Sequence, residues 1–460
     1  MIFLNNLLIY FITFGALLQL LVEVKSQITT KPDLRLAHTA TLIDDKLYIL
    51  GGEIPPRSSG KQPKETFLYI DVSTPFNTNE VKYTDLSNSI VPSREYAIAT
   101  KGGANNSTLF LYGGATFTNQ ELVYAFDAQH SAWYIPKPTG DPPVGKDFMS
   151  PVIDDNGLLY MFGGSRPVSG YVNDMFILDT IHFNWKKSSA INPPSSRDGY
   201  SAVFLPNKTI VYLGGYGPSG PNGSGPSNWL PLDEVYLYDT INSSWETKKV
   251  DGTVPAPRAA FSAVLGPDSQ RVIIFGGDTN STSKNVLYSE NALYVLNLNT
   301  IQWQVPPTSG KPPSSRTFHR TLTIGKYMVV TFGDGYTRDS ENDILLLDIS
   351  NNDQYVWTTN FEPQSLISQS TTPQLPAPQS SHSNINKMGI AIGTLIGIIC
   401  GIALTIGSFF LYKQYKNRRE VIPIPGDEII NKYPEETLKE RSAVVEKKSW
   451  NNFFQSKSSR

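Results

Sequence analysis

The stretch YILGG, residues 48–52, joins a short apolar run to a glycine pair, and five variants of it follow along the chain. They are FLYGG at 110–114, YMFGG at 160–164, VYLGG at 211–215, IIFGG at 273–277 and VTFGD at 330–334. The first glycines are Gly51, Gly113, Gly163, Gly214, Gly276 and Gly333, which gives spacings of 62, 50, 51, 62 and 57 residues. Six similar units predict a repeat architecture, because each unit can bury its apolar faces only against its neighbours.

Each unit carries further marks at similar offsets. A basic residue precedes the pair by 16 to 19 positions, and these residues are Arg35, Arg94, Lys146, Arg197, Arg258 and Arg316. After the pair comes an alternating run that ends in Asp or Asn, such as TFLYID at 66–71. An aromatic residue follows, namely Trp133, Trp185, Trp245, Trp303 or Trp357, with Tyr83 as a substitute in the first unit. Four short strands separated by turn residues predict an antiparallel meander in each unit.

A single sheet of this kind cannot bury both of its faces. Six sheets arranged radially can, because each face then packs on the next sheet, and this arrangement is a β-propeller. Glycine pairs suit the crowded centre, where the chain needs a positive φ or a close backbone approach. Tryptophan on the outermost strand would fill the widening space between two sheets. We therefore predict an all-β fold, a six-bladed β-propeller.

The order of these marks also resembles a known repeat. A basic residue, an aromatic residue or His, an apolar strand, Gly-Gly, a Tyr-rich strand and Trp resemble the kelch repeat over about residues 34 to 360. The resemblance implies a kelch-type propeller, the fold of the central domain of galactose oxidase. Two departures are that the first repeat lacks the tryptophan and that the sixth has Asp334 in place of the second glycine. How the ring closes stays open, because residue 357 already supplies a fourth strand to the last unit.

Composition excludes several classes of site. The chain has 460 residues, a net charge of −2 and one cysteine, Cys400. The repeats therefore contain no disulfide, no cysteine-based metal site and no thiol nucleophile. Without a domain-sized basic stretch, the chain does not suggest nucleic-acid binding.

Two apolar segments bracket the repeats. The first, LLIYFITFGALLQLL at 7–21, is followed by small residues at Val24 and Ser26, which predicts a signal peptide over residues 1–26, with an uncleaved anchor as the alternative. The second, at 388–412, has 25 residues without a charge, which is enough to span a hydrocarbon core of about 30 Å. The basic KQYKNRR that follows places the C-terminus in the cytosol. These features predict a single-pass type I membrane protein with an extracellular or lumenal propeller.

The predicted domains are therefore the propeller at 27–360, a Ser/Pro/Gln-rich stalk at 361–387, the transmembrane helix at 388–412 and a cytoplasmic tail at 413–460. Candidate N-glycosylation sites lie on the external side, at Asn105, Asn106, Asn207, Asn222, Asn242 and Asn280. In the membrane segment, Gly389, Gly393, Gly397 and Gly401 recur at every fourth residue. Such a row favours helix–helix packing in a homodimer or with a partner helix, although glycine is also common in membrane helices generally.

The binding surface is predicted on one face of the disc. In a four-stranded meander, the loops between strands two and three emerge on the same face as the connections between units. The 2–3 loops vary most in length, for example residues 53–64 and 216–232. Variable loops on a rigid scaffold often carry binding, although they can also be tolerated insertions. The six basic residues lie near this face, where they form either a ring that binds acidic ligands or a structural set in which each pairs with a carboxylate or carbonyl of a neighbouring blade.

Two functions stay open from the sequence. The favoured one is a cell-surface or endomembrane binding protein whose long-loop face binds a protein or a glycan. The alternative is a membrane-tethered carbohydrate-active enzyme with its site at the channel mouth, which carboxylates with shifted pKa values would favour. Copper-radical chemistry of the galactose-oxidase type is argued against, because it requires a cysteine that this ectodomain lacks. The dispersed histidines show no metal-ligand spacing, so no catalytic residue, cofactor or metal is predicted.

Overall fold

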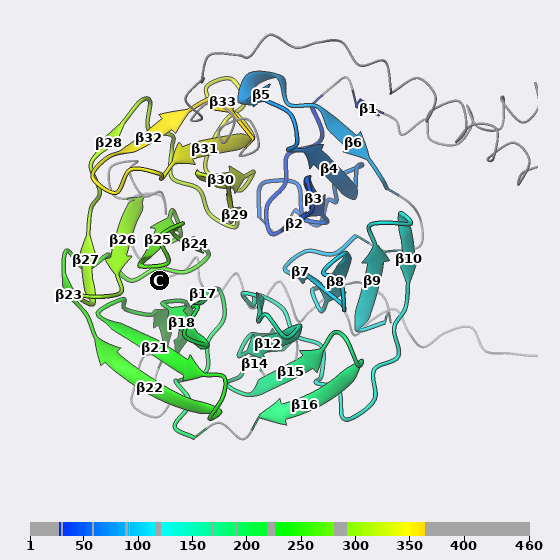
Figure 1. Cartoon of the computed structure of the whole chain (residues 1–460), viewed down its shortest axis with the longest axis vertical. Helices are drawn as coiled ribbons and strands as arrows, with labels where there is room; N and C mark the ends of the chain where they lie inside the picture. The colour runs from blue at the N-terminus through cyan, green and yellow to red at the C-terminus, as the bar shows by residue number, and fades with distance from the viewer. Residues whose placement is uncertain are drawn as a thin grey trace, which may run out of the picture. The chain divides into compact units, whose positions relative to one another are not determined.

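The computed structural model describes residues 27–28 and 31–363, apart from 58, 88–90, 92, 116–120, 167–169, 189–190, 219–225 and 280–291. These residues form six sheets of four or five strands around a central axis, together with three two-stranded sheets (Figure 1). In each of the six blades, strand one lies nearest the axis and strand four lies at the rim (Figure 1). The predicted all-β, six-bladed propeller is confirmed.

Each blade is an antiparallel meander from one continuous stretch of chain. Blades 1 to 3 contain β2 (Thr39–Ile43), β3 (Lys46–Leu50), β4 (Phe67–Asp71) and β6 (Tyr83–Asp85); β7 (Ile98–Gly102), β8 (Thr108–Tyr112), β9 (Val123–Asp127) and β10 (Ala132–Tyr134); and β11 (Val152–Ile153), β12 (Leu158–Phe162), β15 (Met175–Asp179) and β16 (Asn184–Ser188). Blades 4 to 6 contain β17 (Ser201–Phe204), β18 (Thr209–Leu213), β21 (Glu234–Asp239) and β22 (Ser244–Lys249); β24 (Ser262–Leu265), β25 (Arg271–Phe275), β26 (Leu293–Asn297) and β27 (Gln302–Gln304); and β29 (Arg320–Ile324), β30 (Tyr327–Thr331), β31 (Ile344–Asp348) and β32 (Tyr355–Thr358). Three rims gain a fifth strand: β1 (Gln27–Ile28) on blade 1, β23 (Asp251–Gly252) on blade 5 and β28 (Thr308–Ser309) on blade 6.

The core of the described residues consists of six hydrophobic wedges, one between each pair of neighbouring blades. Between blades 1 and 2, for example, the rings of Phe67 and Phe126 meet with their centroids 4.9 Å apart. Because a blade is covered on both faces, its inner strands are buried at nearly every position, and all five residues of β25 are buried. Each predicted tryptophan packs in one of these wedges, and Tyr83 takes that place between blades 6 and 1. The predicted role of these aromatic residues is confirmed.

The glycine pairs mark the closest approach of neighbouring blades. Gly51 has a φ of +69°, and a Cβ there would lie 2.1 Å from the carbonyl oxygen of Arg94 in the next blade. The N–H of Gly52 donates to that same oxygen at 2.9 Å. The corresponding bond to the basic residue of the following blade is donated by Gly114, Gly164, Gly215, Gly277 and Gly333. The pair is therefore needed because a side chain at the first position would collide with the neighbouring backbone.

The sixth repeat differs from the predicted alignment. The N–H of Gly333 donates to the carbonyl of Arg35 at 3.0 Å, which is the role of the second glycine elsewhere. Phe332 occupies the first position, at a φ of +44°, and its buried side chain fills the wedge between blades 6 and 1. Asp334 corresponds to the residue after the pair, because it forms an isolated bridge with Thr317. The prediction that Asp334 replaces the second glycine is therefore wrong, and Phe332 replaces the first glycine instead.

The ring closes between two complete blades. β33 (Asn360–Phe361), which follows blade 6, pairs antiparallel with β5 (Phe76–Asn77) of the first repeat. The rings of Phe361 and Phe76 stack with their centroids 4.7 Å apart. Among the described residues, the closure therefore exchanges no strand between the two ends of the propeller.

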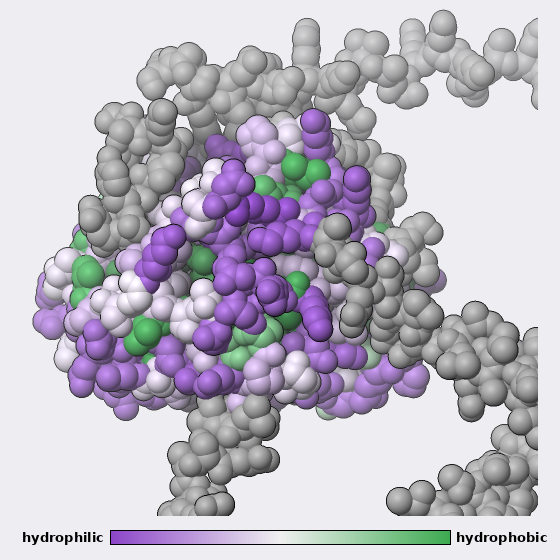
Figure 2. Space-filling view, turned by 90° about the horizontal axis from the view of Figure 1, so that it is seen from above, coloured by the Kyte–Doolittle hydropathy of each residue, from purple (hydrophilic) through white to green (hydrophobic). Residues whose placement is uncertain are grey.

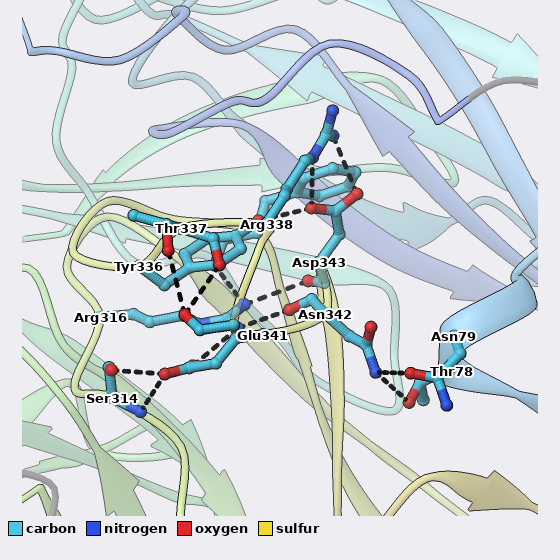
Figure 3. Close-up of polar contacts among 12 residues, drawn as sticks. Thr78, Asn79, Ser314, Arg316, Tyr336, Thr337, Arg338, Glu341, Asn342 and Asp343 are labelled. Atoms are coloured by element: carbon cyan, nitrogen blue, oxygen red, sulfur yellow. Dashed lines mark hydrogen bonds and ion pairs between the residues drawn. The ribbon is translucent and has the colours of Figure 1, made fainter.

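Polar contacts reinforce the same seam between the last and first repeats. The side-chain amide of Asn342 donates to Thr78 Oγ1 and Asn79 Oδ1, both at 2.9 Å (Figure 3). Nearer the axis, Nε2 of His38 lies 2.7 Å from Oγ1 of Thr331. Blade 1 is thus joined to blade 6 from the rim to the centre.

The predicted segments outside the propeller lie beyond the described residues. These are the signal peptide, nearly all of the stalk, the transmembrane segment with its glycine row, the tail, and the sequons at Asn222 and Asn280. Within the part of the chain that the structure describes, no helix is long and apolar enough to cross a membrane. The other four sequon residues, Asn105, Asn106, Asn207 and Asn242, are exposed in turns between strands one and two or three and four. Their glycosylation stays a prediction.

Candidate functional site

The rim of the propeller offers no obvious apolar docking patch in the view of Figure 2. There the described surface is mostly hydrophilic, and hydrophobic residues are scattered over it. The most exposed large apolar side chains of the described residues, Ile241, Val144 and Ile191, come from different connections along the chain. Single apolar residues of this kind are ordinary on a protein surface and do not indicate a docking site.

The six basic residues of the predicted ring are buried in the structure. Their residue exposure is 0% for Arg35, Arg258 and Arg316, 1% for Arg197 and 2% for Arg94 and Lys146. Burial lowers the pKa of Arg35 and that of Arg258 to about 10, which leaves both charged at neutral pH.

Arg316 shows the contacts of this set in detail (Figure 3). Its Nη1 donates to the carbonyl oxygens of Phe332 and Asp343, each at 3.2 Å. Its guanidinium carbon lies 3.6 Å from the ring centroid of Tyr336. The equivalent bond to the first glycine of the pair is made by Arg94, Arg197 and Arg258. These contacts favour the structural interpretation, but the predicted pairing with a neighbouring blade is wrong for these bonds. The five arginines donate to the carbonyl at the glycine turn of their own blade, and Lys146 pairs with Asp174 of its own blade instead.

Residues two positions after each basic residue form a ring around the axis. They are Ala37, Tyr96, Phe148, Gly199, Ala260 and Phe318, all with φ between +54° and +59°. Each N–H donates to the carbonyl of its counterpart in the preceding blade at 2.8 to 3.2 Å, so six hydrogen bonds form a closed circle. Residues with side chains rarely adopt such positive φ values, which persist only where the surrounding structure holds them. Here the circle of hydrogen bonds at the centre of the propeller holds them.

Three aromatic side chains of this ring meet across the axis. Tyr96 and Phe148 stack with their centroids 3.8 Å apart. Phe318, from the blade opposite Phe148, lies 6.0 Å from it and 5.8 Å from Tyr96. We call these three residues the aromatic floor. Because they span the ring, the floor closes the axis at this level.

The mouth lies on the long-loop face, around this floor. It is formed by isolated bridges that pair the residue after each basic residue with the residue after each glycine pair. The twelve positions are Leu36, Glu95, Asp147, Asp198, Ala259 and Thr317, and Glu53, Ala115, Ser165, Tyr216, Asp278 and Asp334. Six of the twelve are acidic and none is basic, so the mouth is acidic although the whole chain is nearly neutral.

Two of these carboxyl groups are coupled. Glu95 and Glu53 share a side-chain hydrogen bond, and burial together with the neighbouring Glu53 raises the pKa of Glu95 from 4.5 to about 8. Glu53 is 1% exposed, and its Oε1 accepts a hydrogen bond from the N–H of Gly60 at 3.0 Å. In the next blade, burial raises the pKa of Asp147 to about 6. Carboxylates crowded away from water retain protons, so this part of the mouth titrates near neutral pH.

Polar and aromatic groups extend the site around blades 3 and 4. The hydroxyl of Ser165 donates to Asp147 Oδ1 at 2.7 Å and is 3.0 Å from Asp198 Oδ2, which links two mouth carboxylates. Beside them, the ring of Tyr216 lies 5.9 Å from that of Tyr171 and 5.2 Å from that of Trp229. These rings come from the hairpins β13 (Ser165–Arg166) with β14 (Gly170–Tyr171) and β19 (Tyr216–Pro218) with β20 (Ser227–Trp229). The mouth therefore combines negative charge with aromatic surface.

Replacing Glu95 with glutamine should stabilise the propeller at pH 8 and have little effect at pH 4. The carboxyl titrates at about 8 in the folded chain and near 4.5 when free of its neighbours, so ionisation costs stability as the pH rises through that window. Glutamine removes this cost and still supplies a donor to Glu53. Urea denaturation at both pH values checks the result, with the surface change Glu246→Gln as the control. An equal effect of Glu95→Gln at pH 4 and pH 8 would contradict the coupling.

Histidines and metals do not contribute a second site in the described part of the chain. His38 and His319 start strand one, as the kelch pattern implies, and both are buried. Burial lowers the pKa of His319 to about 3, so it is neutral at physiological pH. No group of three or more His, Cys, Asp or Glu residues among the described positions is arranged to hold a metal ion.

A separate cavity of about 700 Å³ lies at the seam between blade 6 and the first repeat. Its lining includes Lys31, Lys311, Asn342 and Trp357. Asn342 is already bonded across the seam, and Arg338 at its edge is paired with Asp343 at 2.8 Å (Figure 3). This cavity is built from residues that hold the ring closed, and it shares none of the mouth positions.

The fold and the mouth define a kelch-repeat propeller. A family model described as the KLHDC2/KLHL20/DRC7 Kelch-repeats domain matches residues 37–224 and 220–394, and the chain belongs to this family. The solved structure titled "Structure of YjhT" superimposes with a TM-score of 0.53 at 14% identity, covering 73% of this chain and 100% of that one. At this identity the likeness supports the fold alone.

Curated relatives show the same repeats in proteins of different organisation. Host cell factor 1 of Homo sapiens is 26% identical over 49% of this chain but over only 11% of its own length. Acyl-CoA-binding domain-containing protein 5 of Arabidopsis thaliana is 24% identical over 69% of this chain and 46% of its own length. Kelch domain-containing protein 3 of Rattus norvegicus is 26% identical over 69% of this chain and 84% of its own length. This chain thus spans about a tenth of the first of these relatives and most of the last.

The sequence analysis placed the binding surface on the long-loop face, which stays a prediction, and it missed the acidic residues of the mouth. The signal was present directly beside the marks already used: REY at 94–96, KDF at 146–148 and RDG at 197–199 place an acid after the basic residue. GGE at 51–53, GGD at 276–278 and FGD at 332–334 place an acid after the pair. Only an alignment of the six repeats in register, read for charge, would have gathered these residues into one site.

Proposed function

We propose that this chain is a binding protein whose propeller holds a protein partner at the mouth. The supporting observation is the composition of that surface, where a rigid backbone ring presents acidic residues and aromatic rings. Aromatic residues in a fixed setting supply contact area at low entropic cost, which is typical of binding surfaces. Kelch-repeat propellers generally bind protein partners.

The proposal includes the membrane-anchored form. It is supported by the uncharged segment at 388–412, the basic residues after it and the apolar N-terminal segment. In this arrangement the propeller faces the extracellular or lumenal side and the short tail faces the cytosol. Alkaline extraction of membranes from cells that make the full chain should leave the protein in the membrane pellet. Its release into the soluble fraction would reject the anchor.

Two alanine substitutions, one in the mouth and one on the opposite face, test the binding surface. The full chain, purified in detergent, is screened against arrays of cell-surface proteins and of glycans. Changing Tyr216 to alanine in the mouth should weaken binding of a protein by about tenfold, a typical loss for an aromatic interface residue. Changing Ile241 to alanine should have no effect, because this residue is 75% exposed in a turn on the opposite face. Binding that is sensitive to Ile241→Ala instead, or that is confined to glycans, would overturn the proposal.

The coupled carboxyl groups support a second candidate, a carbohydrate-active enzyme. Glu95 and Glu53 are a carboxyl pair in which one partner stays protonated near neutral pH, a property that general acids in glycoside hydrolysis share. Cleavage of an arrayed glycan by the full chain, and its loss in Glu95→Gln, would establish this function. Intact glycans after incubation with the unmodified chain would reject it.

A further inference from the structure

We infer that the mouth binds an arginine or lysine side chain of the partner protein, and that Arg57 of the loop between β3 and β4 occupies this place in the free chain. The inference rests on the proposed function and specifies the chemistry of the partner. Recognition of a guanidinium or ammonium group uses carboxylates and the face of an aromatic ring together. Both features are present at the mouth.

Two acidic groups of the mouth, Glu53 and Glu95, are not neutralised by an ion pair among the described residues. The basic residues directly before Glu95, Asp198 and Ala259 point into their own blades, where Arg94, Arg197 and Arg258 bond to glycine carbonyls. Within the residues that the structure describes, Glu53 and Glu95 form no ion pair; the ion pairs there involve other acids, such as Asp174 with Lys146 and Arg166. The Glu53–Glu95 pair therefore has capacity for an added positive charge.

Glu53 carries the clearest sign of a missing partner. Its Oε2 is buried, and no N–H or hydroxyl group of the described residues donates a hydrogen bond to it. Its Oε1 accepts a hydrogen bond from the N–H of Gly60. The neighbouring carboxyl of Glu95 supplies a donor only when it is protonated. A buried carboxylate oxygen left unpaired is costly, so an incoming cation would replace a shared proton as the partner of this pair.

The aromatic floor already holds a guanidinium group. The guanidinium carbon of Arg57 lies 5.2 Å from the ring centroid of Phe318, within the range of a cation–π contact. Burial raises the pKa of Tyr96, a second residue of the floor, and the nearby carboxyl groups of Glu53 and Glu95 raise it further. The charge of Arg57 lowers this pKa, so Arg57 lies close enough to act on the same hydroxyl. Its loop folds back on itself, since Ile54 N–H donates to Lys61 O at 2.8 Å. The loop thus presents a basic side chain to the same surface that a partner would use.

Peptide pools that differ only in charge test the inference. Fluorescent heptapeptides with random flanks carry either arginine or citrulline, its uncharged isostere, at the centre, and their binding to the full chain in detergent is followed by polarisation. The arginine pool should bind about tenfold more tightly, the scale of a desolvated cation–π contact. Arg57→Gln should tighten binding of the arginine pool several-fold by removing the resident cation. Glu95→Gln should abolish the preference, whereas Glu246→Gln on the outer surface should keep it.

Each outcome bears on the inference separately from the proposed function. Equal binding of the two pools, or a preference unchanged by Glu95→Gln, would overturn it, while a protein partner sensitive to Tyr216→Ala would leave the proposed function intact. Conversely, a clear arginine preference with no protein captured on the arrays would support the inference and reject the broader proposal. Urea denaturation of each variant confirms that lost binding does not reflect lost folding.

Discussion

Replacing Gly276 with alanine should unfold the propeller or lower its free energy of unfolding by more than about 4 kcal/mol. A Cβ at this position would lie 2.2 Å from the carbonyl oxygen of Arg316 and 2.9 Å from Cε1 of His319. The first contact is with backbone, which also accepts the N–H of Gly277 at 2.9 Å. Relief therefore requires two blades to move apart, and the wedge between them would lose its close packing. Chemical denaturation, or the yield of folded protein, measures the effect.

Gly170 provides the matched control for this substitution. Its φ of +68° is nearly identical to the +69° of Gly276, but a Cβ there meets nothing within 4 Å. Gly170→Ala should therefore show only the cost of a left-handed alanine, about 1 kcal/mol. The difference between the two variants isolates the close approach of blades from backbone strain. Equal losses in both variants would show that φ, and not the neighbouring blade, explains the glycine pairs.

Replacing Arg258 with methionine should destabilise the chain by about 3 kcal/mol. The side chain is buried and donates to the carbonyls of Gly276 at 3.0 Å and Ala256 at 3.1 Å. Its guanidinium carbon also lies 5.1 Å from the ring centroid of Tyr294. Methionine keeps much of the volume but leaves these carbonyls without donors. The midpoint of urea denaturation measures the loss.

Lys248→Met is the control for the loss of a cation. Lys248 lies on the outer strand β22, 39% exposed, and its ion pair with Glu246 spans 3.6 Å, so its removal should change stability by less than about 0.5 kcal/mol. If Arg258→Met proved equally harmless, the buried basic set would be free to serve as a binding ring. If a variant of a buried residue such as Arg197 or Arg258 lost binding, the loss could reflect unfolding. A folding measurement would therefore be needed before the loss is assigned to the interface.

Repetition in the sequence was enough to predict the architecture. The spacing of the glycine pairs, the alternating runs and the outer tryptophans each reflect a local requirement, and each recurs often enough to identify six blades. The alignment failed only at Phe332, where the glycine that remains in FGD has the role of the second member of the pair. A single glycine does not say which of two positions it fills, because both positions need positive φ.

The sequence by itself determined the fold, the number of blades, the face that carries the variable loops and the uncharged segment at 388–412. Only the tertiary structure decided what the charged residues do. The five arginines of the basic set are conspicuous in the sequence but turn inward and donate to carbonyls at the glycine turns, while the acidic residues beside them lie around the mouth. The reason is that Glu53 and Glu95 come from different repeats and meet only when the six repeats close around one axis. The sequence indicates their positions within the repeat but not the contact between their carboxyl groups.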